Sequence, residues 1–313
     1  MAVQESFLFL SSDKKNMIHA VRWIPEDGEI KAILQITHGM VEYIERYNGF
    51  AEFMTKQGFL VTGHDHLGHG QSVANKADWG YIPEGNGSDL LIEDMHTLRR
   101  TTQKQYPYKP YFMLGHSMGS YMLRKYLTIH GDNLTGAIIM GTGAAPDSVS
   151  KSGIILCKII AKFHGWRYRS TFVQNITYGK PYKQFCLDGS IPENSWLTKD
   201  TEIVKKYYND PCCTFMFTLA AYRCLFEAVL YDNQLANTKK IPKNLPLILL
   251  SGEQDPVGDL GEGVKAVYEQ LKTVGIKNVK YKLYKDDRHE ILNETDKESV
   301  YEDILAWCQE QLA

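Results

Sequence analysis

Short apolar runs alternate with helical patterns over most of this 313-residue sequence. The apolar runs predict strands at residues 32–37, 59–63, 111–114, 135–140, 245–251 and 279–284. Helical spacing, as in Leu91, Met95 and Leu98, predicts helices at 46–57, 89–105, 118–130, 261–274 and 297–311. Residues 6–10 and 16–23 precede this alternation and predict an antiparallel strand pair. The pattern indicates an α/β fold with a mostly parallel sheet and helices on both faces.

The alternation lapses between residues 144 and 240, where helical patterns and aromatic side chains occur without a strand–helix unit. We therefore expect a core made of 1–143 and 241–313, with 144–240 as an insertion on the sheet. One helical pattern in it carries an apolar stripe: Ile154, Ile155, Leu156, Ile159, Ile160 and Phe163. Packing of this stripe on the core is a simpler expectation than a lipid-binding surface, so at most transient membrane contact is predicted.

Ser117 is the candidate nucleophile, because Gly115-His-Ser117-Met-Gly119 fits G-x-S-x-G between a predicted strand and a predicted helix. A sharp turn there exposes the hydroxyl to a base, and glycines at 115 and 119 leave room for the backbone. An ordinary strand–turn–helix connection uses the same residue types, but the flanking strand and helix favour the catalytic interpretation.

His289 is the candidate base. In α/β proteins whose nucleophile stands on a G-x-S-x-G turn, the order along the chain is nucleophile, acid, histidine. Only His130, His164 and His289 follow Ser117. His130 ends the helix that carries Ser117, and His164 lies in the insertion. His289 follows the last predicted strand, although a charged loop such as Lys285–His289 also carries surface histidines.

The acid is expected after the strand at 245–251, where Asp255 stands in a turn made stiff by Pro256. Its function would be to fix the tautomer of His289 and to stabilise the imidazolium. Glu253 and Asp259 are the rival acids in the same loop, and an Asp-Pro turn also occurs without a catalytic purpose.

An oxyanion hole needs the amide of the residue after the nucleophile and a second amide from the loop after the strand at 32–37. These requirements indicate the backbone amides of Met118 and Met40. Because the amide acts and not the side chain, methionine at both positions is compatible with the function.

Charge and cysteine content indicate which partners and which cellular compartment to expect for this protein. Lys and Arg number 35 and Asp and Glu 37, for a net charge of −2, so nothing predicts nucleic acid as a partner. Six scattered cysteines without a C-x-x-C pair indicate reduced thiols in a cytoplasmic protein. No secretory signal pattern and no membrane-spanning run is recognised.

Five segments together resemble the monoacylglycerol lipase and lysophospholipase family, other members of which are serine aminopeptidase-like hydrolases. They are His38-Gly-Met-Val-Glu42, His64-Asp-His-Leu-Gly68-His-Gly70-Gln-Ser72, Gly115–Gly119, and the loops of Asp255 and His289. Trp196-Leu-Thr-Lys-Asp200 and the segment from Tyr207 to Pro211 are similar to bacterial members. Many relatives have arginine where His66 stands. The resemblance extends from about Asn16 to the C-terminus.

The resemblance implies an eight-stranded α/β-hydrolase core with a helical cap, no metal or organic cofactor, and hydrolysis of single-chain acyl esters. It carries Ser117, Asp255 and His289 over as the triad. His64, His66 and His69 suggest a metal site by number alone, but the family implies a structural turn there. Cap aromatics suit an apolar or aromatic acyl group: Phe163, Trp166, Tyr168, Phe172, Tyr178, Tyr182, Phe185 and Trp196.

Two other functions stay open from the sequence. An aminopeptidase or amidase of this fold needs cap carboxylates for a free amino terminus, for which Glu193 or Asp200 are candidates. A non-catalytic small-molecule receptor has no need of Ser117, Asp255 and His289 together. The sequence predicts no oligomeric state.

Overall fold

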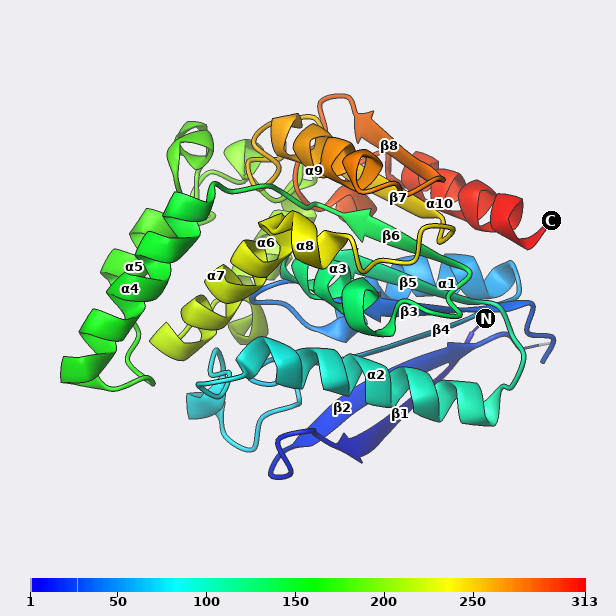
Figure 1. The fold of residues 1–313 in the computed structure, drawn as a ribbon, viewed down its shortest axis with the longest axis horizontal. Coiled ribbons are helices and arrows are strands. Elements are labelled where there is room, and N and C mark those ends of the chain that lie inside the picture. The colour runs from blue at the N-terminus through cyan, green and yellow to red at the C-terminus, as the bar shows by residue number, and fades with distance from the viewer. Residues whose placement is uncertain (1, 27) are drawn as a thin grey trace.

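The computed structural model describes residues 2–26 and 28–313. Within these residues, the eight strands β1 to β8 form one sheet (Figure 1). The order across the sheet is β1-β2-β4-β3-β5-β6-β7-β8. Only β2 runs antiparallel to its neighbours, and the other pairs are parallel. The strands are β1 (Val3–Leu10), β2 (Met17–Ile24), β3 (Ala32–Thr37), β4 (Phe59–His64), β5 (Tyr111–His116), β6 (Gly136–Met140), β7 (Leu247–Gly252) and β8 (Val279–Tyr284). The mostly parallel sheet predicted from the alternation is confirmed.

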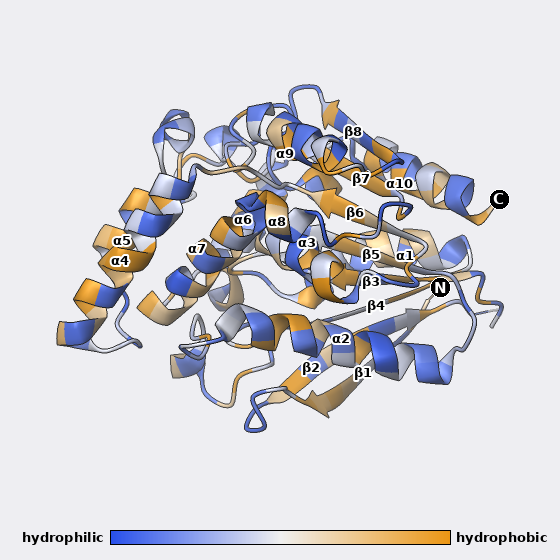
Figure 2. Cartoon of the chain, viewed as in Figure 1, coloured by the Kyte–Doolittle hydropathy of each residue, from blue (hydrophilic) through white to orange (hydrophobic). Residues whose placement is uncertain are grey.

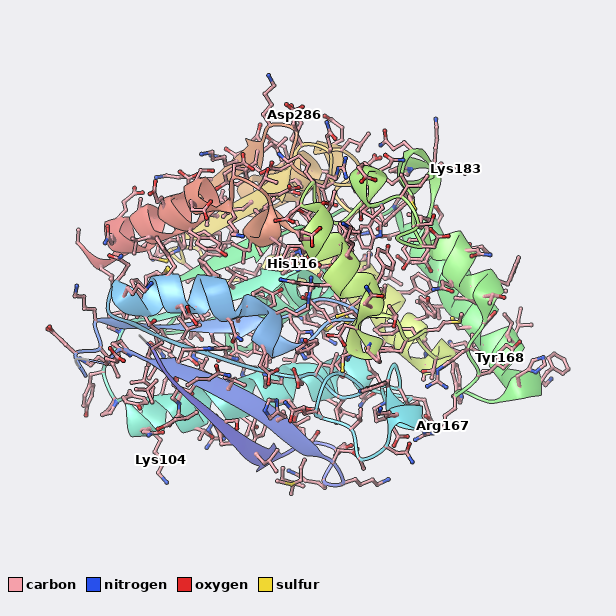
Figure 3. The ribbon with its side chains drawn as sticks, turned by 180° about the vertical axis from the view of Figure 1, so that it is seen from behind. Lys104, His116, Arg167, Tyr168, Lys183 and Asp286 are labelled. Atoms are coloured by element: carbon pink, nitrogen blue, oxygen red, sulfur yellow. The ribbon has the colours of Figure 1, made fainter. Side chains whose placement is uncertain are left out.

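Helices cover both faces of the sheet. On one face lie α1 (Asn48–Lys56) and α10 (Lys297–Leu312), which are in front in Figure 3. On the other lie α2 (Gly87–Gln105), α3 (Met118–His130) and α9 (Glu262–Thr273), in front in Figure 1. Each face has its own apolar core, so strands in the middle of the sheet are buried on both sides. That double burial explains why these strands read as continuous apolar runs, which are orange in Figure 2.

The ends of the elements follow local chemistry. Gly58, with φ +90°, follows the end of α1, as expected for a glycine after a helix C-terminus. The helix predicted at 46–57 begins instead as a 3₁₀ turn that precedes α1. The 3₁₀ turns of the described chain are η1 (Ile44–Tyr47), η2 (Lys76–Asp78), η3 (Lys180–Gln184), η4 (Pro192–Asn194), η5 (Pro211–Cys213) and η6 (Ile291–Asn293).

Between β6 and β7 the described chain adds helices and no strand to the sheet. They are α4 (Asp147–His164), α5 (Thr171–Thr177), α6 (Thr201–Asn209), α7 (Leu219–Asn233) and α8 (Leu235–Thr238). In Figure 1, α4 and α5 form the outer edge, and α7 lies between them and the core. Since α7 packs on α4 and also on α2 and α3, it joins the segment to the core.

The apolar stripe of α4 is only partly packed, contrary to the expectation that it lies on the core. Ile154, Leu156 and Ile160 pack against the core, but the side chains of Ile155, Ile159 and Phe163 are exposed (58%, 55% and 76%). The stripe is wider than the surface that α7 covers. No helix in the described ranges is long and apolar enough to cross a bilayer.

Candidate active site

Ser117 occupies a strained turn between β5 and α3. Its φ and ψ are 54° and −121°, a conformation that L-residues rarely adopt. A Cβ on Gly115 would lie 2.4 Å from the carbonyl oxygen of Gly119, and one on Gly119 would lie 2.1 Å from that of Thr37. The two glycines therefore permit a backbone approach that any side chain would prevent, and the serine is held at the top of the turn.

Asp255 and His289 meet across two loops at the carboxyl edge of the sheet. The Nδ1 of His289 lies 2.9 Å and 3.0 Å from the two carboxylate oxygens of Asp255. Burial alone would raise the pKa of Asp255. The interaction with His289, the amide of Val257 and the hydroxyl of Ser251 outweigh it, so the pKa is lowered. The carboxylate is thus charged and orients the imidazole.

Neither the rival acids nor the rival histidines belong to the Asp255–His289 pair. Glu253 and Asp259 are exposed, and neither is hydrogen-bonded to His289. His130 pairs with Glu93, its Nε2 2.9 Å from the carboxylate, and His164 stacks on Tyr168. Within the described residues the ring of His289 is hydrogen-bonded only to Asp255, so no hydrogen bond joins it to the Ser117 hydroxyl in this state. Hydrogen bonds of catalytic groups often form fully only when substrate is bound.

The loop after β3 lies directly against the nucleophile turn. A Cβ on Gly39 would come within 2.9 Å of the Cβ of Ser117. Among the hydrogen bonds between described residues, none uses the amide of Met40 or Met118. Both residues line the same cavity as Ser117, which leaves two amides available to an oxyanion.

A cavity of about 830 Å³ opens over these residues. Ser117 and His289 both line it, and most of its wall comes from the segment between β6 and β7. Of the eight cap aromatics predicted to line it, only Tyr178, Tyr182 and Trp196 do so. The other aromatic side chains that line the cavity are Tyr121, Tyr207, Tyr208, Phe215, Phe217, Tyr222 and Phe226. No described lysine or arginine lines the cavity, and its wall is mostly apolar, so it suits a large apolar ligand.

His64 at the end of β4 and His66 and His69 in the following loop are buried and pack on one another. The ring centroids of His64 and His66 lie 5.0 Å apart, and those of His66 and His69 lie 6.2 Å apart. Gly68 and Gly70 have positive φ angles (75° and 46°), as a tight bend requires. The His/Asp/Glu groups that come close enough to share a metal, within the described ranges, are two others: His19, Glu45 and Asp65, and Asp287, Glu294 and Asp296.

A buried ionic network beside the nucleophile was missed from the sequence. Glu42 lies 3.2 Å from the Nδ1 of His116 and 2.9 Å from Arg46, and Arg46 makes a bidentate pair with Glu290 at 2.7 Å. In Figure 3, His116 lies in the interior, while the labelled Lys104 and Asp286 lie at the periphery. The available signal was that His116 precedes Ser117 and Glu290 follows His289.

Comparisons with known proteins identify the family of this chain. The model of the family described as Serine aminopeptidase, S33 matches residues 28–296. A monoglyceride lipase homolog of Monkeypox virus is 28% identical over 88% of this chain and 89% of its own. The monoglyceride lipase of Homo sapiens is 25% identical over 93% and 86%, respectively. A carboxyl esterase from Bacillus coagulans, solved in complex with glycerol, is 30% identical with a TM-score of 0.90 over 99% of both chains. Because the family model covers most of the chain, this protein belongs to the Serine aminopeptidase, S33 family of α/β-hydrolases, and its relatives indicate a carboxylic ester hydrolase.

Proposed function

We propose that this carboxylic ester hydrolase cleaves uncharged single-acyl esters such as monoacylglycerols, with Ser117, His289 and Asp255 as its triad. The observation that carries the proposal is the hydrogen bond of His289 to Asp255, at 2.9 Å, in a cavity that Ser117 also lines. The strained turn of Ser117 supports it further, since strain of this kind clusters at active sites.

The mechanism is acyl transfer in two steps. His289 accepts the Ser117 proton as the hydroxyl attacks the ester carbonyl, and the amides of Met40 and Met118 bind the oxyanion. His289 then donates the proton to the departing alcohol, which leaves an acyl group on Ser117. A water molecule, deprotonated by His289, attacks the acyl group. His289 returns this proton to the Ser117 oxygen as the acid leaves, and Asp255 stabilises each imidazolium. Residues 144–240 act in the proposal as the cap that encloses the acyl chain.

The charge of the cavity favours neutral glycerides over lysophospholipids. None of the described wall residues is a lysine or arginine, and His116 is paired with Glu42, so a phosphate would find no unpaired counter-charge. The acids Glu42 and Glu290 are already paired with Arg46, and Asp188, Asp259 and Glu262 are exposed. An uncharged headgroup avoids the desolvation cost of an unpaired phosphate.

An aminopeptidase function has less support. Asp200 accepts hydrogen bonds from the amides of Glu202 and Ile203, which caps α6, and Glu193 is exposed. Neither lines the cavity, so the two carboxylates considered for a free amino terminus lie outside it.

The experiment compares turnover of 1-monoacylglycerols, lysophosphatidylcholine, p-nitrophenyl esters from acetyl to palmitoyl, hydroxycinnamate esters and aminoacyl anilides. We expect monoacylglycerols to exceed lysophosphatidylcholine of the same acyl chain, and anilides not to be cleaved. A fluorophosphonate probe should label Ser117, and Ser117→Ala should abolish both labelling and turnover. Full turnover by Ser117→Ala contradicts the triad, and absence of turnover on every ester favours a receptor.

A further inference from the structure

His116 is buried between the nucleophile turn and the loop of His289. Its Nε2 lies 3.2 Å from the main-chain carbonyl oxygen of His289, and the two imidazole centroids are 4.6 Å apart. A carbonyl oxygen only accepts hydrogen bonds, so Nε2 must carry the proton. This bond connects the residue before Ser117 with the proposed base.

The other ring nitrogen of His116 faces acceptors. Its Nδ1 lies 3.2 Å from Oε1 of Glu42 and 3.1 Å from the hydroxyl of Tyr47. Tyr47 donates its only proton to Glu42, at 3.0 Å, and an ionised carboxylate has no proton to give. A neutral imidazole would therefore direct a lone pair at Glu42, whereas an imidazolium donates to it. Both nitrogens of His116 consequently carry protons.

The pKa directions agree with this geometry. Burial opposes the charged form of His116, but the hydrogen bond and charge of Glu42 outweigh it and raise its pKa. Burial would likewise raise the pKa of Glu42, but His116 and Arg46 lower it well below its ordinary value. A charged and hydrogen-bonded pair is the arrangement that makes burial of both groups tolerable.

The Glu42–His116 pair connects the loop of Met40, the nucleophile turn and the loop of His289. Glu42 accepts a hydrogen bond of 2.5 Å from the amide of Gly39, in the loop that carries Met40. His116 belongs to the nucleophile turn and donates to the loop of His289. These side chains also separate the large cavity from a smaller one of about 210 Å³, which Glu42, His116 and Glu290 line as well.

We propose that His116, held as an imidazolium by Glu42, is a positioning residue that fixes the His289 loop against the turn of Ser117. The proposal rests on the proposed triad, since it assigns His116 a function through Ser117 and His289. The charge of His116 also matters, because His116 and Arg46 balance Glu42 and Glu290. The other ionisable groups nearby include His38, Tyr47, His289 and Asp255. Loss of the imidazolium leaves one unbalanced negative charge beside the loop of His289.

The kinetic test uses two amides that replace different atoms of the ring. The longer amide side chain of His116→Gln takes the place of Nε2 and reaches the carbonyl of His289, but it is uncharged. The shorter amide of His116→Asn takes the place of Nδ1 and reaches only toward Glu42. We expect Asn to lower kcat about 10- to 100-fold with KM little changed, since misplacement of a reacting group by ~1 Å has such effects. Gln should lose less kcat, and the acidic limb of its pH–rate profile should move to higher pH. His130→Gln, on the surface end of α3, is the matched control.

Nitrogen NMR on the full chain with ¹⁵N-labelled histidine tests the charge without using activity. At pH 8, the His116 signals, assigned by their loss in His116→Gln, should show protons on both nitrogens. A single protonated nitrogen overturns the imidazolium. Equal kcat and thermal midpoint losses in the Gln and Asn variants, without a shift in the pH limb, overturn the positioning function. Failure of the proposed triad is distinct from both, because it would appear as turnover by Ser117→Ala.

Discussion

The indole of Trp196 stacks on the imidazole of His289, with ring centroids 5.1 Å apart and planes inclined by 29°. The amide of His289 also donates a 3.4 Å hydrogen bond to the carbonyl of Trp196. Trp196 belongs to the segment between β6 and β7, so this segment reaches the proposed base as well as forming the cavity wall. Tyr178 and Tyr182 pack on the same indole, with centroids 6.3 Å and 5.4 Å away.

We expect Trp196→Ala to lower kcat/KM about tenfold or more, because the imidazole loses the surface that restricts its orientation. Trp196→Phe should recover most of the activity, since a smaller ring still stacks on His289. The matched control is Trp166→Ala, a half-buried tryptophan of the same segment outside the cavity wall. Steady-state kinetics on p-nitrophenyl butyrate provide the measurement. Similar losses at positions 166 and 196 would mean that the stack is not functional.

Gly39→Ala should reduce kcat by about 10²–10³, as loss of an oxyanion donor does. The added Cβ would lie 2.6 Å from the Glu42 carboxylate and 2.9 Å from the Cβ of Ser117, so the loop that carries Met40 must shift. KM should change little if the amide acts mainly in the transition state. Gly49→Ala in α1, where the nearest atom is 3.6 Å away, should retain activity. An unchanged kcat in Gly39→Ala would show that this loop does not contribute to the oxyanion hole.

Asp255→Asn should lower kcat about 10⁴-fold, because an amide holds His289 in the wrong tautomer without disturbing the packing. Labelling by a fluorophosphonate probe should slow in parallel. Glu253→Gln and Asp259→Asn, at the exposed rival acids of the loop, are the controls and should retain activity within about threefold. If Asp259→Asn is the variant that loses turnover, the acid of the triad is wrongly assigned.

The fold was predictable because its signals are local. Five of the six strands between residues 32 and 284 are apolar enough to be recognised singly, and β8 alternates apolar residues with lysines. The end of α3 at His130 agrees with the prediction. The pairing of Glu42 with His116 was not predictable, since it joins side chains 74 positions apart whose meeting depends on the folded sheet. The cavity wall was predicted in part for the same reason. Phe163 reads as a lining residue by composition, yet its place on α4 leaves it 76% exposed.

Asp232 in α7 provides a prediction about stability. Its carboxylate is buried, neither oxygen has a hydrogen-bond partner among the described residues, and Arg124 Nε is 3.8 Å away. Burial raises the pKa of Asp232 from 3.8 to about 7, although Arg124 and Lys125 oppose the change. The folded state therefore binds a proton between about pH 4 and 7 that the unfolded state has released, so stability falls as pH rises through this window.

We expect Asp232→Asn to unfold at a higher temperature than the unsubstituted protein at pH 8, where the native carboxylate is charged. The pKa change corresponds to about 4 kcal/mol, which is an upper bound on the difference in the free energy of unfolding. The advantage should shrink as pH falls and vanish near pH 5, where the native carboxyl is neutral. Thermal midpoints of both proteins from pH 5 to 8 measure it, with Asp132→Asn at an exposed position as the control. A lower midpoint for Asp232→Asn at pH 8 would show instead that the charged pair with Arg124 stabilises the fold.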